Sequence, residues 1–250
     1  DYKGRYLFEV SGRYDGSSRF APGHRWGTFG SAGAAWLINK EKFFNADWVN
    51  ELKLKVSYGV TGNDNLDDAD FYLYTNNYTL KPYNYETGLY AKELTQAGNS
   101  ELTWEKSQAF NVGVDFALFR KLTGSFEYFD RKSKDLLFTM PMALSTGFSG
   151  IDRNIGDVKN YGVEATFDFA AVNNDNFKWN ISFNATSYKN VITSLPQDEM
   201  TKEVFKWREG QSRYNFWGVK FAGVNPENGN AQYWMNVYDT DSNGKKVIVK

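Results

Sequence analysis

Four segments between residues 110 and 189 alternate strictly between apolar and polar side chains. On the first, Phe110, Val112 and Val114 share one face, and Asn111 and Asp115 share the other. A period of two indicates β-strands, because successive side chains of a strand point to opposite faces of its sheet. The segments that follow this pattern are residues 110–118, 122–128, 161–169 and 177–184. The pattern predicts a sheet with one apolar and one polar face.

The same alternation occurs earlier in the chain, over residues 6–14, 26–38 and 52–60. Trp26 and Trp36 fall ten residues apart on the apolar face of the second of these segments. At ~3.3 Å per residue and a tilt near 40°, this spacing projects to roughly 25 Å, the height of the apolar band of an outer-membrane barrel. The two tryptophans are therefore expected to mark the two edges of a membrane.

The opposite face of these strands carries charge of both signs. Its charged residues are Glu9, Arg13, Lys53, Lys55, Asp115, Glu127, Glu164, Asp168 and Lys178. Lysines 53 and 55 cannot face a dry core without partners, since burying an unpaired charge is costly. We expect this face to be wet and its charges to pair across neighbouring strands.

Connections of two lengths alternate along the chain. Short ones are expected at residues 39–50, 119–121 and 173–176, and long ones at 15–25, 62–103, 141–157 and 194–230. Membrane barrels have this asymmetry, with short periplasmic turns and longer extracellular loops. We also expect a helical turn within 41–50, a short strand near 216–221 and another from residue 233. The pattern favours a membrane barrel and leaves a soluble β protein open.

Composition narrows the class of protein further. The net charge of −1, the absence of Cys and the single residue His24 disfavour nucleic-acid binding, disulfides, zinc sites and histidine-based triads. Aromatic residues make up 18% of the chain while its mean hydropathy is −0.59, which suits a sheet with one wet face. The chain starts at Asp1 directly before a strand pattern, so we expect it to be an interior piece of a longer chain.

Several short stretches along the chain can be compared with known families. They are DGSSRF at 15–20, RWGTF at 25–29, LKLKVSYGVTGN at 52–63, LTWE at 102–105, YFDRKSKDLL at 128–137, NIGD at 154–157, GVE at 162–164 and GVNPENG at 223–229. Together these stretches resemble the C-terminal part of the barrel of SusC-like TonB-dependent outer-membrane transporters (the RagA/SusC family). They follow the family's order over nearly the whole chain. Asn225 departs from the pattern, where Asp is expected.

The resemblance implies an all-β fold: an antiparallel transmembrane barrel of 22 strands, of which residues 1–250 form one partial domain with about seven or eight strands. It implies residence in the bacterial outer membrane, in contact with its lipid, and import of oligosaccharides or peptides. The partners it implies are a SusD-like surface lipoprotein and the TonB complex, which acts through an N-terminal region outside these residues. We expect no cofactor, no metal and no enzyme activity.

Aromatic residues in the predicted long loops are the candidate substrate contacts, because rings stack on apolar surfaces and Tyr hydroxyl groups hydrogen-bond. The candidates are Tyr72, Tyr74, Tyr78, Tyr83, Tyr85, Trp207 and Trp217. The alternative for each is packing between loops or against the lipoprotein. A second hypothesis for the chain is a soluble or surface-attached glycan-binding module that uses the same loops.

Two further patterns in the loops point to weaker hypotheses. The Asp- and Asn-rich residues 63–70 suggest a calcium loop, but the EF-hand spacing fails, since Tyr74 stands at its twelfth position. Paired carboxylates such as Glu101 and Glu105 suggest glycoside hydrolysis, but nothing in their spacing makes them converge. A solvated acidic loop is the simpler interpretation of both.

Overall fold

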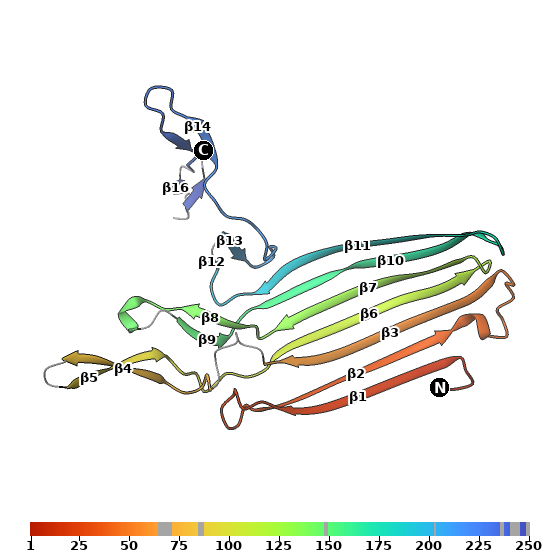
Figure 1. Ribbon diagram of the computed structural model, residues 1–250, viewed down its shortest axis with the longest axis horizontal. Helices are drawn as coiled ribbons and strands as arrows, with labels where there is room; N and C mark the ends of the chain where they lie inside the picture. The colour runs from red at the N-terminus through yellow and green to blue at the C-terminus, as the bar shows by residue number, and fades with distance from the viewer. Residues whose placement is uncertain are drawn as a thin grey trace.

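The computed structural model describes residues 1–64, 72–84, 88–147, 150–202, 204–235, 238–240 and 246–248. Its main element is a seven-stranded antiparallel sheet with the order β1-β2-β3-β6-β7-β10-β11 (Figure 1). The strands of this sheet are β1 (Tyr6–Gly16), β2 (Trp26–Leu37), β3 (Val49–Asn63), β6 (Glu105–Leu118), β7 (Leu122–Lys134), β10 (Asp157–Asn173) and β11 (Lys178–Ser194). The predicted antiparallel sheet is confirmed. Among the described residues, no helix is long and apolar enough to cross a membrane.

The strand register confirms the two predicted faces. Phe8 pairs with Ala34, Ala34 with Val56, and Val56 with Val112, so one apolar row runs across four strands. The row continues through Tyr128, Val163 and Ser187 to the far edge of the sheet. The described residues form no second layer over this face. Phe8 and Phe183, near its two edges, are 68% and 59% exposed.

Aromatic pairs lie near both ends of the first hairpin. Trp26 stacks on Tyr14 with ring centroids 5.0 Å apart, and Trp36 stacks on Tyr6 at 6.3 Å. Both tryptophans lie on the apolar face of β2, as the sequence predicted. At the same end of the sheet as Trp36, Trp48 stacks on Phe119 at 5.2 Å, in the short connections. Rings therefore border the apolar face, as in the aromatic girdles of membrane barrels.

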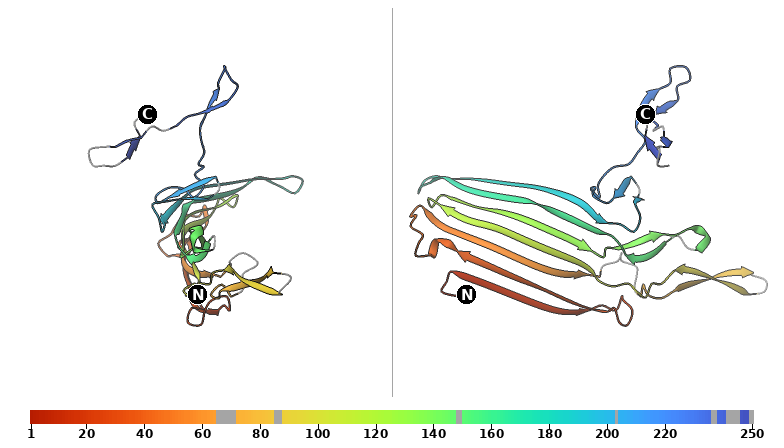
Figure 2. Two further views of the ribbon diagram at one scale, coloured as in Figure 1. Left: turned by 90° about the vertical axis from the view of Figure 1, so that its left-hand side faces the viewer. Right: turned by 180° about the vertical axis from the view of Figure 1, so that it is seen from behind.

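In the described part of the chain, the ten other strands form five two-stranded hairpins outside the main sheet. They are β4 (Asn77–Asn84) with β5 (Leu89–Gln96), β8 (Leu137–Pro141) with β9 (Gly150–Asn154), β12 (Glu199–Lys202) with β13 (Phe205–Arg208), β14 (Phe221–Val224) with β15 (Ala231–Tyr233), and β16 (Tyr238–Thr240) with β17 (Lys246–Ile248). In Figure 1 and in the right-hand view of Figure 2, β4–β5 and β8–β9 extend beyond one end of the sheet, while the short turns lie at the other. The predicted short turns at 119–121 and near 174–177 and the predicted long connections after β3, β7 and β11 are confirmed, whereas 38–48, predicted short, is longer than 17–25, predicted long.

Three local predictions were wrong. The turn of helix expected within 41–50 is instead a 3-10 turn at Ile38–Lys40, followed by bends up to Val49. The expected strand at 216–221 is displaced to β14, and Phe216 makes only an isolated bridge to Phe205. The last expected strand is β15, which ends rather than begins at Tyr233. In each case the boundary of the element depends on hydrogen bonds to a hairpin partner or within a turn. The periodicity of apolar residues does not reveal these hydrogen bonds.

Glu41 closes the short connection after β2. Its carboxylate accepts hydrogen bonds from the Tyr6 hydroxyl at 2.6 Å and from Trp36 Nε1 at 3.0 Å, and it pairs with Arg5 at 3.1 Å. The hydrogen bonds from Tyr6 and Trp36, with a smaller contribution from Arg5, hold the pKa of Glu41 below its usual value near 4.5. One carboxylate thus ties the first strand to the second at this end of the sheet.

We expect Glu41→Gln to lower the thermal stability of the whole protein at pH 7. Because the pKa of Glu41 is depressed in the folded state, its charge stabilises the fold above pH ~4.5 and loses this effect as the pH falls through the folded pKa. The thermal midpoints of wild type and variant should therefore differ at pH 7 and converge as the pH falls below the folded-state pKa of Glu41. The control is Asp47→Asn, exposed on the same connection. A difference that is constant with pH would show that the charge of Glu41 is not involved.

Candidate functional site

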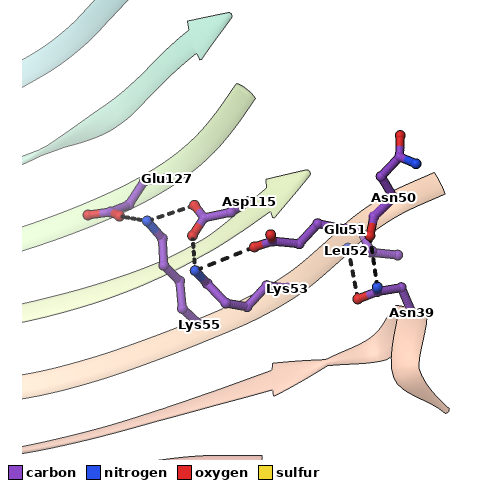
Figure 3. A network of polar contacts seen from close by, with 8 residues as sticks. All are labelled: Asn39, Asn50, Glu51, Leu52, Lys53, Lys55, Asp115 and Glu127. Carbon is purple, nitrogen blue, oxygen red and sulfur yellow. Dashed lines mark hydrogen bonds and ion pairs between the residues drawn. The ribbon is translucent and has the colours of Figure 1, made fainter. Parts of the chain in front are cut away.

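Ion pairs on the polar face connect three neighbouring strands (Figure 3). Lys55 Nζ lies 3.0 Å from both Asp115 on β6 and Glu127 on β7. Lys53 Nζ lies 2.8 Å from Asp115 and 3.8 Å from Glu51. We call these five residues the lysine network. The side chains of the two lysines are only 28% and 35% exposed, and the three carboxylates give the network a net charge of −1. This confirms the predicted cross-strand pairing at the centre of the sheet.

The network does not include every charge that the sequence placed on this face. Arg13 pairs at 3.5 Å with Asp15 of its own strand, and Asp168 accepts a hydrogen bond from Ser182 at 2.5 Å. In the described part of the chain, Glu9, Glu164 and Lys178 make no ion pair. These charges lie on a wet surface, where leaving them unpaired costs little.

A hollow of about 250 Å³ lies beside the lysine network. Gly33 and Ser57 form its floor, and the longer side chains of Glu9, Lys55 and Asn111 stand around it. The depression arises because Gly33 and Ser57, which pair on adjacent strands, have small side chains. The Oδ1 atom of Asn111 is buried and has no hydrogen-bond partner among the described residues. The hollow therefore offers polar groups to water or to whatever faces this side of the sheet.

An apolar cluster at the long-loop end holds three connections together. Its buried residues are Phe20, Phe29, Leu73, Leu102 and Trp104. The Trp104 indole packs edge-on against Phe29 at 5.3 Å and donates a hydrogen bond from Nε1 to the Arg25 carbonyl at 2.9 Å. Sequence reasoning did not find this cluster. The Trp-containing stretch 102–105 was the available signal, but nothing in the sequence indicates which loops it joins.

Two of the candidate tyrosines lie next to this cluster. Tyr72 is 54% exposed with a positive φ of 66°, and its ring meets that of Tyr74 edge-on at 6.1 Å. The Tyr74 hydroxyl accepts a weak hydrogen bond of 3.4 Å from the Arg25 guanidinium. Tyr72 is thus available to a ligand, whereas Tyr74 is partly engaged in holding the loop.

The other candidate tyrosines belong to the β4–β5 hairpin. Tyr78 is half-exposed, and the Lys92 ammonium lies 3.8 Å from its ring centroid, a cation–π contact. Tyr83 lies in β4, but only its backbone is among the described residues, and Tyr85 is outside them. The hairpin therefore places at least one exposed ring of the predicted set beyond the end of the sheet.

Trp207 and Trp217 lie on or beside the β12–β13 hairpin. Trp207 packs on Phe138 of β8 at 5.4 Å and donates its Nε1–H to the Arg213 carbonyl at 2.9 Å. Trp217 is half-exposed, with Lys206 Nζ 4.0 Å from its ring centroid. The ring of Trp217 is therefore more accessible, while Trp207 mainly packs within the protein.

The β12–β13 hairpin also carries a charged cluster. Hydrogen bonds from Lys206 and Arg208 hold the pKa of Glu199 below its usual value.

Trp207 also lines an apolar cavity of about 70 Å³ between this hairpin and the main sheet. Leu137, Ile192 and Met200 are among its apolar lining residues, and Arg213 also lines it. No group of three or more His, Asp or Glu side chains within the described ranges is arranged to hold a metal ion. Residues 65–70 of the proposed calcium loop lie outside those ranges.

The uncovered apolar face decides the class of protein. A face of exposed Phe, Val and Tyr across seven strands needs an apolar phase, and a membrane provides one that is bordered by aromatic girdles. The sheet is thus the wall of a transmembrane β-barrel. Residues 1–245 match the family described as TonB dependent receptor-like, beta-barrel. The chain belongs to this family.

Known proteins of the family support this assignment. The chain is 33% identical over 248 residues to the TonB-dependent receptor SusC of Bacteroides thetaiotaomicron, which covers 97% of this chain and 24% of SusC. It is 36% identical over 228 residues to TonB-dependent receptor P39 of Formosa agariphila, over 90% of this chain and 21% of that receptor. The solved structure of the RagAB peptide transporter superposes with a TM-score of 0.83 at 27% identity, over 97% of this chain and 27% of that one.

The chain spans about a quarter of the length of these relatives. The predicted resemblance to SusC-like transporters and the predicted fold class are confirmed. The sheet described here has two free edges, β1 and β11, and is not closed. Membership of a family of membrane barrels also disfavours the alternative of a soluble glycan-binding module.

Proposed function

We propose that the chain is part of the wall of an outer-membrane importer. In this arrangement the apolar face contacts lipid, and the lysine network and its hollow face the lumen. The long-loop end lies outside the cell, since membrane barrels have short periplasmic turns and long extracellular loops. The observation that carries the proposal is the uncovered apolar face opposite an ion-paired polar face.

The proposal extends to partners and substrates. The relatives named SusC and RagAB support a working unit with a SusD-like surface lipoprotein, energised by TonB. The substrate class is an oligosaccharide or a peptide. Residues 1–250 contribute one partial barrel domain to this unit, and they supply scaffold and loops rather than catalytic groups.

Within that unit, the open aromatic rings of the loops are the proposed substrate contacts. Tyr72 and Trp217 are the candidates whose rings are most accessible, at 54% and 51% exposure. Tyr78 is less exposed, at 46%, and Trp207 packs on Phe138; Tyr78 and Trp217 each have one ring face against a lysine, Lys92 and Lys206. We therefore assign Tyr72 and Trp217 the larger part in binding.

The test is uptake by cells that carry the whole gene with the changes Tyr72→Ala and Trp217→Ala. Labelled oligosaccharides and peptides are supplied one at a time, and the substrate is the one whose uptake disappears when the gene is deleted. We expect each change to lower uptake of that substrate about 2- to 10-fold, since an aromatic contact contributes about 0.5–1.5 kcal/mol.

The matched control is Phe43→Ala, an aromatic residue that is 68% exposed at the opposite end of the sheet. It should leave uptake unchanged at equal protein level. If deletion of the gene alters uptake of neither substrate class, the import function is wrong. If deletion of the gene abolishes uptake but Tyr72→Ala and Trp217→Ala leave uptake at the level of the control, the import function is supported and the assignment of the two rings is wrong.

A further inference from the structure

Lysines gather on the outer surface of the barrel wall, above the apolar band. They are Lys106 on β6, Lys132 and Lys134 on β7, Lys159 on β10 and Lys189 on β11. The register places all five on the same face as the apolar row. Lys106 is opposite Lys134, Lys132 is opposite Lys159, and Lys189 is opposite Tyr161. We call this group the lysine belt.

The lysine belt lies immediately beyond the apolar row and on the side of the long loops. Toward the short turns, Tyr128 and Val163 occupy the same face four residues from Lys132 and Lys159, and Val112 lies six residues from Lys106. Neighbouring strands are ~4.8 Å apart and a two-residue step is ~6.6 Å, so the belt covers roughly 15 Å by 15 Å. This is the height at which headgroups of the outer leaflet meet the wall, if the long loops are extracellular as proposed.

The belt has an excess of positive charge. Two carboxylates share this surface, and each pairs with one lysine: Asp130 with Lys159 at 2.7 Å, and Asp157 with Lys132 at 3.1 Å. Lys106, Lys134 and Lys189 form no ion pair in the described part of the chain. Five lysines less two carboxylates leave a charge of +3 on this surface. The two pairs fix the centre of the belt, and the three other lysines stand around it.

We propose that the lysine belt binds the phosphate groups of an outer-leaflet lipid whose acyl chains lie along the apolar row below. Lysine ammonium groups near a membrane surface attract anionic headgroups, and clusters of them between spanning elements bind lipid phosphates. The belt combines this charge with direct continuity to the lipid-facing surface, and Tyr128 and Tyr161 stand at the boundary between the two. The inference rests on the proposed orientation of the wall.

The test uses the whole transporter purified in a neutral detergent. Native mass spectrometry measures how much bis-phosphorylated lipid A the protein retains, compared with the same lipid after its phosphates are removed. We expect the triple variant Lys106→Gln, Lys134→Gln and Lys189→Gln to bind the phosphorylated lipid roughly 100-fold more weakly. This corresponds to about fivefold for each lysine near an anionic headgroup.

The matched control removes three exposed lysines at the short-turn end, Lys42→Gln, Lys121→Gln and Lys178→Gln, and should bind like wild type. In wild type, raising NaCl from 50 to 500 mM should release the phosphorylated lipid and leave retention of the dephosphorylated lipid unchanged. The salt dependence is measured on the wild-type protein alone, so it does not depend on whether a variant folds.

Three results would overturn the proposal. They are equal retention of the two lipids, equal loss in the control variant, and competition by inorganic phosphate at millimolar concentration, which would show a free-anion site. None of these depends on which nutrient is imported, so uptake in cells tests the import function separately.

Discussion

Arginine at position 185 is expected to destabilise the folded transporter in a lipid bilayer by about 2–4 kcal/mol, the cost of a lipid-facing Arg at the middle of a barrel strand. Ala185 on β11 pairs with Ala165 of β10 on the apolar face. It lies six residues from Trp179 and four from Lys189, which places it near the middle of the apolar band. An arginine there must extend through hydrocarbon to reach water.

The neighbouring substitution Asn184→Arg is the matched control. Asn184 pairs with Thr166 on the polar face at the same height, so its arginine points into the wet interior. Denaturant titration of the whole protein in phosphatidylcholine vesicles measures both. We expect a loss of stability for Ala185→Arg several times that for Asn184→Arg. Equal losses would mean that the two faces meet the same environment.

We expect Lys55→Glu to lower the free energy of unfolding by about 2 kcal/mol. The change replaces two ion pairs by three carboxylates in contact, at positions 55, 115 and 127. Breaking a fully buried pair costs about 3–5 kcal/mol. Because the side chain of Lys55 is 35% exposed, solvent screens the repulsion and the expected cost is smaller.

The double variant Lys55→Glu with Glu127→Lys exchanges the two charges. It therefore distinguishes the effect of charge on stability from the effect of side-chain size. It restores one pair between the same two positions, and Asp115 keeps its pair with Lys53. We expect the double variant to recover at least half of the stability that Lys55→Glu loses, again by denaturant titration. Recovery should weaken as salt rises. No recovery in the swap would mean that the lysine network does not stabilise the sheet through charge.

The strands were predictable because their two faces meet different environments. Alternation from Phe110 to Leu118 and from Tyr161 to Phe169 is strict, and a slip of one residue would turn every apolar side chain toward water. The same alternation placed Lys53 and Lys55 on the charged face and predicted pairing with neighbouring strands, but it did not identify Asp115 and Glu127 as their partners. Such a pattern is informative wherever one face is lipid and the other is water.

The loop end was not predictable in the same way. The β4–β5 hairpin and the cluster around Trp104 depend on contacts between segments far apart in the sequence, such as Leu73 with Leu102. No periodicity marks these contacts, since each loop buries only one or two side chains. For this reason the sequence identified the aromatic candidates but could not tell the accessible Tyr72 and Trp217 from the packed Trp207.

The central claim is that alternate residues of each long strand face lipid and water, and β10 tests it most directly. The chain has no Cys, so single cysteines can be placed at residues 163–168 of the whole transporter, free of other cysteines, and spin-labelled in phosphatidylcholine vesicles. Collisions with oxygen report lipid, and collisions with a nickel chelate report water. We predict that labels at Val163, Ala165 and Phe167 meet oxygen, and that those at the intervening positions meet nickel. Equal nickel access at all six positions, or the opposite phase, would contradict the account.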